Sequence, residues 1–378
     1  MTDFSFLSTF PPTRCGIATF AESLAAGITG AGTDRARIVR LVDELDVTRP
    51  VRVDARTDVA LEWGAGRGSA TLAARALEAA DVAIVQHEYG IYAGADGDAV
   101  HEVLAALSVP SIVVLHTVLD APTPHQREVL ERVAALATRV VVMTETARSL
   151  LASGYDVDLD RVSVIPHGVP SWDGVEASSH ASHRTMLTWG LIGPGKGIEW
   201  GIRALAQLTD LDPPLRYEVL GETHPKVVAH SGETYRDGLR ALAVELGVAD
   251  RVRFDDRYLD LTGLAERVAA ADLVLLPYDS RIQVTSGVLV EAVAAGKRVV
   301  ATGFPHAQEL LADGVGTVVE HESPDAMAAA VRQLLQSPDA VAVRRATARS
   351  ADTSWSTVAD RYRELAADLV APRVAQSA

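Results

Sequence analysis

Short apolar runs alternate with longer segments of helical hydrophobic period along almost the whole chain. Such runs are typical of strands buried on both faces, and their alternation with helices predicts βαβ units around a parallel sheet. The expected strands are residues 4–8, 36–41, 82–86, 111–116, 140–143 and 162–165 in the first half, and 185–191, 216–220, 252–254, 273–277, 298–301 and 316–319 in the second. The pattern predicts an α/β protein with two doubly wound, Rossmann-like domains.

The length of 378 residues agrees with this division, because one hydrophobic core rarely organises so long a chain. The apolar pattern breaks at a Pro-Ser-Trp-Asp-Gly sequence, residues 170–174, and again in the polar stretch 177–184, which predicts a connection between domains. Farther on, a set of apolar residues falls at helical spacing: Trp355, Val358, Tyr362, Leu365 and Leu369. We expect domains at residues 1–170 and 171–354, and at 355–378 a helix and tail that pack back toward the N-terminal domain.

Charge and composition exclude several classes of protein. The formal net charge of −15 argues against a general electrostatic grip on DNA or RNA, which needs clustered Lys and Arg. No stretch approaches the roughly 20 apolar residues of a membrane span, and residues 1–10 lack the basic and apolar regions of a secretory signal. The single cysteine, Cys15, cannot form an intramolecular disulfide, and we expect it to be buried. These features predict a cytoplasmic protein without a transmembrane segment; peripheral membrane contact and the oligomeric state are left open.

In the first half, candidate ligand-binding residues follow the ends of expected strands, where open α/β sheets bind ligands. Gly16 lies between a strand and a helix whose first amides could receive an anion, although a simple turn also explains a glycine there. Glu88 follows the strand at 82–86, and His116 ends the strand at 111–116. Two strand ends that carry Glu and His favour a binding site. Their spacing and the lack of cysteine partners argue against zinc, so we expect no metal site.

The loop at residues 190–197, Gly-Leu-Ile-Gly-Pro-Gly-Lys-Gly, lies between a strand and a helix of the second half. Its glycines permit close approach to the backbone, and Lys196 offers one cation to a diphosphate. The Gly-Lys pair is not followed by Ser or Thr, so this is not a Walker loop, and the glycine spacing does not match the dinucleotide fingerprint. A glycine-rich turn without a ligand is the alternative interpretation.

The segment at residues 277–292 is the most informative part of the sequence. A polar loop leads into a helix near Ser286 and Gly287, where free backbone amides can receive phosphate oxygens. Glu291 lies about one and a half turns into that helix, where a carboxylate can accept hydrogen bonds from two vicinal ribose hydroxyls. Gln283, in the loop, can address a sugar as donor and acceptor. Without these neighbours, Glu291 would be interpreted as a surface residue.

Taken in order, these blocks resemble the family 4 retaining glycosyltransferases with the GT-B fold, over nearly the entire chain. The resemblance is closest to bacterial members with the blocks Pro-Pro-x-x-Cys-Gly-Ile-Ala, Gln-His-Glu-Tyr-Gly-Ile and Gly-x-x-His-Pro, here at residues 11–18, 86–91 and 221–225. It implies two Rossmann-like domains that face each other across a cleft, the first on the acceptor side and the second holding the nucleotide sugar. It also implies transfer of a hexose-type sugar from a nucleotide-diphosphate donor to an acceptor hydroxyl, with retention, without a metal and with no cofactor beyond the donor.

The resemblance assigns roles to residues of the second half. Two glutamates separated by seven residues flank the donor-site helix of the family, and the matching residues here are Gln283 and Glu291, so the first is replaced. Lys196 matches the diphosphate-binding lysine, whereas the usual arginine falls within residues 191–194, which contain no basic residue. Tyr258 is expected in the pocket for the base.

In the first half, the same resemblance implies that His116 contacts the donor sugar, that Gly16 lines the phosphate path and that Glu88 faces the acceptor. Two alternatives stay open. The Gln283 replacement and the missing arginine are also compatible with a nucleotide-sugar-binding protein of this fold with little or no transferase activity. A nicotinamide-dependent oxidoreductase is disfavoured, because the sequence has no N-terminal Gly-x-Gly-x-x-Gly.

Overall fold

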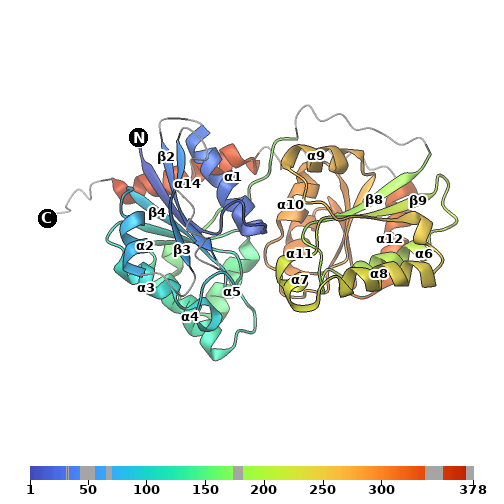
Figure 1. The fold of residues 1–378 in the computed structure, drawn as a ribbon, viewed down its shortest axis with the longest axis horizontal. Helices are drawn as coiled ribbons and strands as arrows, with labels where there is room; N and C mark the ends of the chain where they lie inside the picture. Colours follow the sequence, from blue (N-terminus) through green and yellow to red (C-terminus); the bar gives the residue numbers. More distant parts are fainter. Residues whose placement is uncertain are drawn as a thin grey trace. The chain divides into compact units, whose positions relative to one another are not determined.

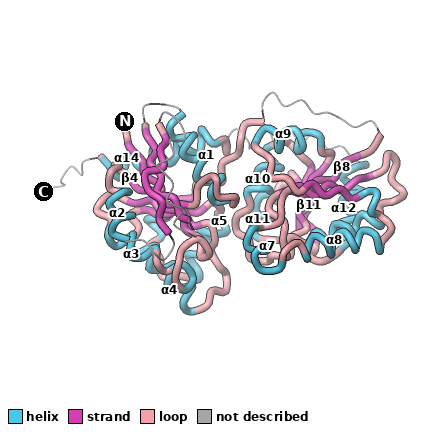
Figure 2. Tube along the Cα trace, in the orientation of Figure 1, coloured by secondary structure: helices cyan, strands magenta, loops and turns pink. Residues whose placement is uncertain are grey.

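The computed structural model describes residues 1–30, 32, 34–42, 56–64, 70–172, 182–336 and 352–371. Two compact units divide the chain: Met1–Gly168 together with Thr353–Ala378, and Val169–Asp352. Each unit contains a parallel sheet with helices packed on it (Figures 1 and 2). The sequence-based boundaries at 170 and 354 lie two residues from these. Most of the expected connection and most of the expected tail, residues 173–181 and 372–378, lie outside the described residues.

The first unit is built on a seven-stranded parallel sheet in the order β3-β2-β1-β4-β5-β6-β7. Its strands are β1 (Asp3–Ser8), β2 (Arg35–Val42), β3 (Thr57–Gly64), β4 (Val82–His87), β5 (Ser111–Leu115), β6 (Arg139–Val142) and β7 (Val162–Val164). Its α-helices are α1 (Gly16–Gly30), α2 (Ala70–Leu77), α3 (Val100–Ala106), α4 (Pro124–Leu136), α5 (Glu145–Gly154) and α14 (Trp355–Val370).

Helix α14 packs beside α1, although more than 300 residues of sequence separate them (Figure 1). The two helices bury their apolar faces against alternate residues of the central strands, including Phe4 and Phe6 of β1. Arg363 of α14 donates to the carbonyl oxygens of Gly27 and Ile28 at 2.8 Å, which satisfies acceptors at the end of α1. The apolar residues that fall at helical spacing in the sequence of α14 therefore pack in the core of the first unit, as expected.

The second unit repeats the architecture with a six-stranded parallel sheet in the order β10-β9-β8-β11-β12-β13. Its strands are β8 (Arg184–Trp189), β9 (Leu215–Leu220), β10 (Val252–Asp255), β11 (Leu273–Leu276), β12 (Arg298–Thr302) and β13 (Gly316–Val319). Its α-helices are α6 (Ile198–Ala206), α7 (Pro225–Ser231), α8 (Thr234–Glu245), α9 (Leu261–Ala270), α10 (Gly287–Ala294), α11 (Pro305–Leu311) and α12 (Pro324–Gln336).

Helices cover both faces of this second sheet, as the continuous apolar strands require. Leu273 and Leu275 of β11 lie in a core with α6, α8 and α12, whereas Val274 and Leu276 lie in a core with α9, α10 and α11. Successive side chains of one strand thus enter opposite cores, which is the period of two expected of a strand. This packing fixes the loops at the carboxyl ends of the strands.

The sequence pattern did not predict strand β3. The reason is its position at the edge of the sheet, where it pairs only with β2. Its sequence, Thr-Asp-Val-Ala-Leu-Glu-Trp-Gly, mixes polar and apolar residues, with Val59 and Trp63 buried and Asp58 partly exposed. An edge strand is less uniformly apolar than the interior strands of a parallel sheet, so a search for continuous apolar runs misses it.

Candidate active site

Both sheets reverse their strand order next to their first strand, between β1 and β4 in the first unit and between β8 and β11 in the second. Doubly wound proteins bind ligands at this switch point, outside the carboxyl ends of the strands. The loops that follow these strands carry Gly16, Glu88, Lys196 and Gln283. The structure therefore places most of the predicted residues at the ligand-binding edge of their own sheet.

In the first unit, His116 follows β5 and bonds to a residue of the neighbouring strand. Its Nε2 lies 2.7 Å from Oε1 of Gln86, and its backbone N–H donates to the carbonyl oxygen of His87 at 3.0 Å. A carbonyl oxygen only accepts, so Nε2 carries the proton and Nδ1 remains an acceptor. The ring of Phe20, one turn into α1, meets the imidazole edge-on at 5.0 Å. Gln86 and Phe20 thus fix the orientation of His116.

Three imidazoles of the first unit, the buried His87 and the partly buried His116 and His167, are uncharged at neutral pH. Burial, together with the neighbouring His167 and His87, lowers the pKa of His116 to about 3. Burial also lowers the pKa of His167 and of His87 to about 4 each. Both ring nitrogens of His87 are buried without a hydrogen-bond partner in the part of the chain that the structure describes. A neutral imidazole offers one donor and one acceptor, which suits recognition of hydroxyl groups.

Glu88 and Gly16 lie at the same edge of the first sheet. The Thr117 hydroxyl donates to Oε2 of Glu88 at 2.5 Å, and the Tyr89 amide donates to Oε1 at 3.0 Å. Glu88 is therefore held between the loops after β4 and β5. Gly16 begins α1, and a Cβ added there would meet no atom within 4 Å, so the backbone at this position is open to approach.

Cys15 is only partly buried, unlike the buried residue expected from the sequence. Its Sγ accepts from the Ala18 amide at 3.3 Å and lies 3.1 Å from Oγ1 of Thr9. These contacts make it a cap for the first turn of α1, where the amides lack partners within the helix. A capping role explains why a position with this much exposure carries a polarisable sulfur.

In the second unit, Lys196 lies in the loop that connects β8 to α6. Its Nζ stands 4.5 Å from the centre of the Tyr278 ring, and among the described residues no carboxylate or hydrogen-bond acceptor pairs with it. Burial lowers the pKa of the ammonium to about 8. Gly197 permits the tight turn, with φ at 61° and a hypothetical Cβ only 1.9 Å from the Pro277 carbonyl oxygen. The backbone thus holds a partly desolvated cation at the switch point.

Glu291 lies on α10 next to the same tyrosine. Its Oε2 accepts a hydrogen bond from Nε1 of Trp189, the last residue of β8, at 3.3 Å. Burial raises the pKa of Glu291 to about 7, and the Trp189 bond only partly opposes this. Burial raises the pKa of Tyr278, and the charge of Glu291 raises it further. Lys196 thus lies over the Tyr278 ring, and Glu291 acts electrostatically on the same tyrosine.

Ser286 and Gly287 begin α10 as the sequence predicts. The Ser286 side chain accepts from the Leu289 amide at 3.3 Å as the helix cap, and its own N–H donates to Nδ1 of His306 at 2.8 Å. The Ser286 amide is thus already occupied, and Gly287 provides the next one. Gln283 lies in the preceding loop, where its amide Nε2 donates to the Thr285 carbonyl oxygen at 3.0 Å.

Tyr258 follows the edge strand of the second sheet, not one of the strands at the switch point. It lies in the loop between β10 and α9, with 45% of its surface exposed. Strand β10 is the edge strand, two strands away from β8. The expected role of Tyr258 in the pocket for the base stays a prediction.

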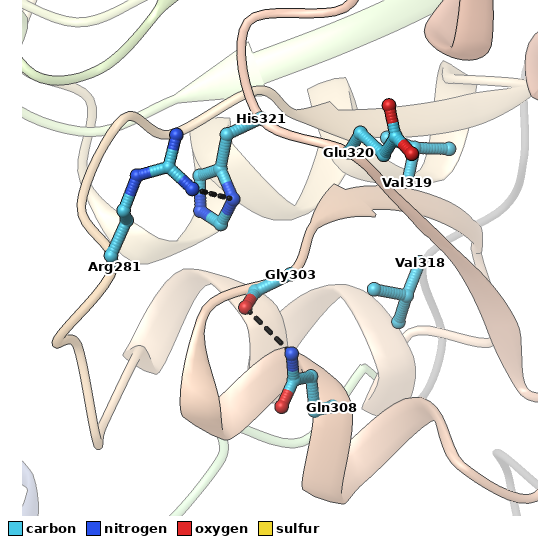
Figure 3. A pocket seen from close by; sticks show the side chains of 7 residues that line it. All are labelled: Arg281, Gly303, Gln308, Val318, Val319, Glu320 and His321. Atoms are coloured by element: carbon cyan, nitrogen blue, oxygen red, sulfur yellow. Dashed lines mark hydrogen bonds between the residues drawn. The ribbon is translucent and has the colours of Figure 1, made fainter.

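A separate hollow of about 650 Å³ opens at the carboxyl ends of β12 and β13 (Figure 3). In the close-up, the Arg281 guanidinium points at the His321 ring, 3.5 Å from Nδ1, and Gln308 donates to the Gly303 carbonyl oxygen at 3.0 Å. Arg281 also lies 3.6 Å from the Glu322 carboxylate. These polar groups are largely satisfied by one another.

The sequence analysis did not single out Trp189, Tyr278 and Gln86 as members of the site. Trp189 is the last residue of β8, Gln86 is the last but one of β4, and Tyr278 is the second residue after β11. An aromatic or amide side chain that ends an otherwise aliphatic run, as Trp189 ends β8, is the signal that could have found them.

No described helix is long and apolar enough to cross a membrane.

Two family models match the chain and together cover both units. The model described as Glycosyltransferase Family 4 matches residues 16–171, and the model described as Glycosyl transferases group 1 matches residues 183–337. Among similar sequences are D-inositol 3-phosphate glycosyltransferases of Mycobacterium ulcerans (33% identical, 67% of this chain, 56% of the relative) and Segniliparus rotundus (30% identical, 67% and 60%). The aligned parts thus span less than two thirds of these relatives' own length.

Solved structures of the same architecture include sucrose-phosphate synthase of Thermosynechococcus elongatus, with a TM-score of 0.78, 16% identity and coverage of 98% of this chain and 100% of that one. The HepE protein of Anabaena, in complex with UDP-glucose, has a TM-score of 0.72, 17% identity and the same coverage. At these identities the likeness shows the fold alone. With its two family matches and its paired parallel sheets, the chain belongs to the family 4 glycosyltransferases and has the GT-B fold.

Proposed function

We propose that this glycosyltransferase moves a hexose from a nucleoside-diphosphate donor, with UDP-glucose as the first candidate, to an acceptor hydroxyl, with retention of configuration and without a metal ion. The observation that carries the proposal is the pair of ionisable groups around Tyr278. Lys196 and Glu291 are partly desolvated, and each has few partners of its own. Perturbed ionisable groups at a switch point are typical of a ligand site.

The chemistry of the two groups suits a nucleotide diphosphate. The Glu291 carboxylate can accept hydrogen bonds from the two vicinal ribose hydroxyls, and the Lys196 ammonium can bind the diphosphate as a point charge. When the glycosidic bond to the donor breaks, negative charge grows on the departing diphosphate. Lys196 and the amides at the start of α10 would stabilise that charge without a metal.

The comparisons support the choice of donor and of the first acceptor to test. Anabaena HepE is solved with UDP and with UDP-glucose, which favours uridine as the base. The relatives named D-inositol 3-phosphate glycosyltransferase favour a phosphorylated polyol as the acceptor. We further propose, on the resemblance to the family, that His116 binds the donor sugar and that Glu88 faces the acceptor.

The test is turnover by the purified full chain. UDP-glucose is incubated with acceptors headed by D-inositol 3-phosphate, and release of UDP is measured with and without EDTA. The expected result is acceptor-dependent UDP release that EDTA does not change, with a product whose anomeric configuration, read by NMR, matches that of the donor. Donor binding without UDP release on any acceptor would instead identify a nucleotide-sugar-binding protein.

A further inference from the structure

The Gly-x-x-His-Pro block at residues 221–225 forms the loop after β9, directly beside the loop that carries Lys196. Ile192 and Thr223 form a β-bridge, and the His224 N–H donates to the Ile192 carbonyl oxygen at 2.8 Å. The approach needs glycine, because a Cβ on Gly221, where φ is 128°, would lie 2.0 Å from the Gly190 carbonyl oxygen. The two loops are therefore joined through their backbones.

A buried arginine fixes the conformation of this second loop. Arg236 of α8 has 1% of its surface exposed, and it donates to Oγ1 of Thr223 at 3.1 Å and to the Gly221 carbonyl oxygen at 2.6 Å. The Thr223 hydroxyl in turn donates to the Glu233 carboxylate at 2.5 Å. Through these two hydrogen bonds a buried, charged side chain fixes two neighbouring groups of the loop. The position of His224 is set by this network.

The contacts of His224 determine which of its ring nitrogens can face a ligand. Nδ1 accepts a hydrogen bond from the Lys226 amide at 3.1 Å, as the cap of α7. Burial lowers the pKa of His224, and the nearby charges of Lys226 and Lys196 lower it further, so the ring is neutral at pH 7. With Nδ1 occupied as an acceptor, the single proton of the neutral ring lies on Nε2. The structure thus presents an N–H donor in the neighbourhood of Lys196.

A diphosphate diester brings two negative charges, and the loop at residues 190–197 supplies only one cation. We propose that Nε2–H of His224 donates a hydrogen bond to the diphosphate of the bound donor, beside Lys196, and so acts as a second diphosphate-binding residue. The inference rests on the proposed function, because it needs a nucleoside diphosphate in the second unit. A hydrogen bond from a neutral donor to a charged phosphate oxygen is stronger than one between neutral groups.

Two substitutions separate this role from helix capping. Asparagine in His224→Asn can keep the cap, with Oδ1 in place of Nδ1, but has no group at the position of Nε2. Glutamine in His224→Gln places an amide N–H near the position of Nε2 but is a poor cap. The matched control is His230→Asn, since His230 is exposed at the other end of α7.

Binding of UDP and of uridine to each full-length variant is measured by calorimetry. For His224→Asn we expect UDP affinity to fall by about tenfold to a hundredfold, as for loss of a hydrogen bond to a charged group, with uridine affinity unchanged. We expect His224→Gln to retain most of the UDP affinity and His230→Asn to match the wild type. UDP affinity of His224→Asn within twofold of the wild type, or an equal loss for uridine, would overturn the inference. A wild-type protein that binds no UDP would overturn the proposed donor and the inference with it.

Discussion

Replacing Lys196 with methionine should stabilise the free protein and at the same time remove donor binding. Burial lowers the pKa of this lysine from 10.5 to about 8, so keeping the ammonium charged in the folded state costs about 3 kcal/mol, at 1.36 kcal/mol per pKa unit. The contact with the Tyr278 ring is a separate favourable term of about 0.5 to 2 kcal/mol. Methionine has a similar length and no charge, so Lys196→Met should raise the free energy of unfolding at pH 7 by about 1 to 3 kcal/mol.

The pH dependence gives this prediction a definite sign. The folded-state pKa lies below the unfolded value, so the unfolded chain binds the proton more tightly and the charged lysine disfavours folding. Below pH 8 the lysine is charged in both states, and the advantage of methionine is complete. Between pH 8 and 10.5 the folded protein releases its proton first, and the advantage should shrink to zero as the pH rises.

Urea unfolding followed from pH 6 to pH 10 measures the stability, and calorimetry with UDP-glucose measures the binding. Lys297→Met is the matched control, because burial lowers the pKa of Lys297 to about 8 as well, but its Nζ donates to the Ala269 and Ala271 carbonyl oxygens at 2.6 and 2.9 Å. The control should gain less stability than Lys196→Met, because two carbonyl oxygens lose their donor, and should keep donor binding. A Lys196→Met protein that is less stable than the wild type, or that binds UDP-glucose normally, would refute the reasoning.

Three further predictions follow from the same structure. UDP-glucose affinity should be greatest between pH 7 and 8, because Glu291 takes up a proton at lower pH and Lys196 loses one at higher pH. A flat calorimetric profile of affinity from pH 6 to 9 would contradict this. Glu291→Gln should weaken UDP binding by about 1.5 to 3 kcal/mol. In urea unfolding the variant should be more stable than the wild type above pH 7, and the gain should vanish below pH 4.5, where the Glu291 carboxyl is protonated in both the folded and the unfolded protein. Tyr362→Phe should raise the unfolding free energy by about 1 kcal/mol, because the Tyr362 hydroxyl is buried without a described hydrogen-bond partner; a loss of stability on urea unfolding would show a partner.

The sequence predicted the interior strands because each is apolar on both faces, and it missed β3 because an edge strand is not. It also placed Lys196 in the loop before one helix and Glu291 about one and a half turns into another, because glycine loops and helix starts have local signatures. Local signatures do not specify which strands become neighbours.

The contacts that define the site depend on those neighbours. Trp189 reaches Glu291 across 102 residues because β8 pairs with β11 rather than with β9 alone. His116 reaches Gln86 across 30 residues because β4 pairs with β5. Strand order is a property of the whole fold, so these pairings could not be predicted from the residues at either end.

Two partly buried lysines of the second unit, Lys196 and Lys297, differ in the partners of their ammonium groups. Both have a pKa lowered to about 8 by burial, so desolvation alone does not separate them. Lys297 has two carbonyl acceptors, whereas Lys196 has only the face of an aromatic ring among its described neighbours. Two carboxylates of the second unit differ in the same respect. Arg257 and Arg267 hold the pKa of Asp255 well below its usual range, whereas burial raises the pKa of Glu291 to about 7. Under the proposed function, a nucleoside diphosphate would bring a group to each of these two residues: ribose hydroxyls to Glu291 and the diphosphate to Lys196.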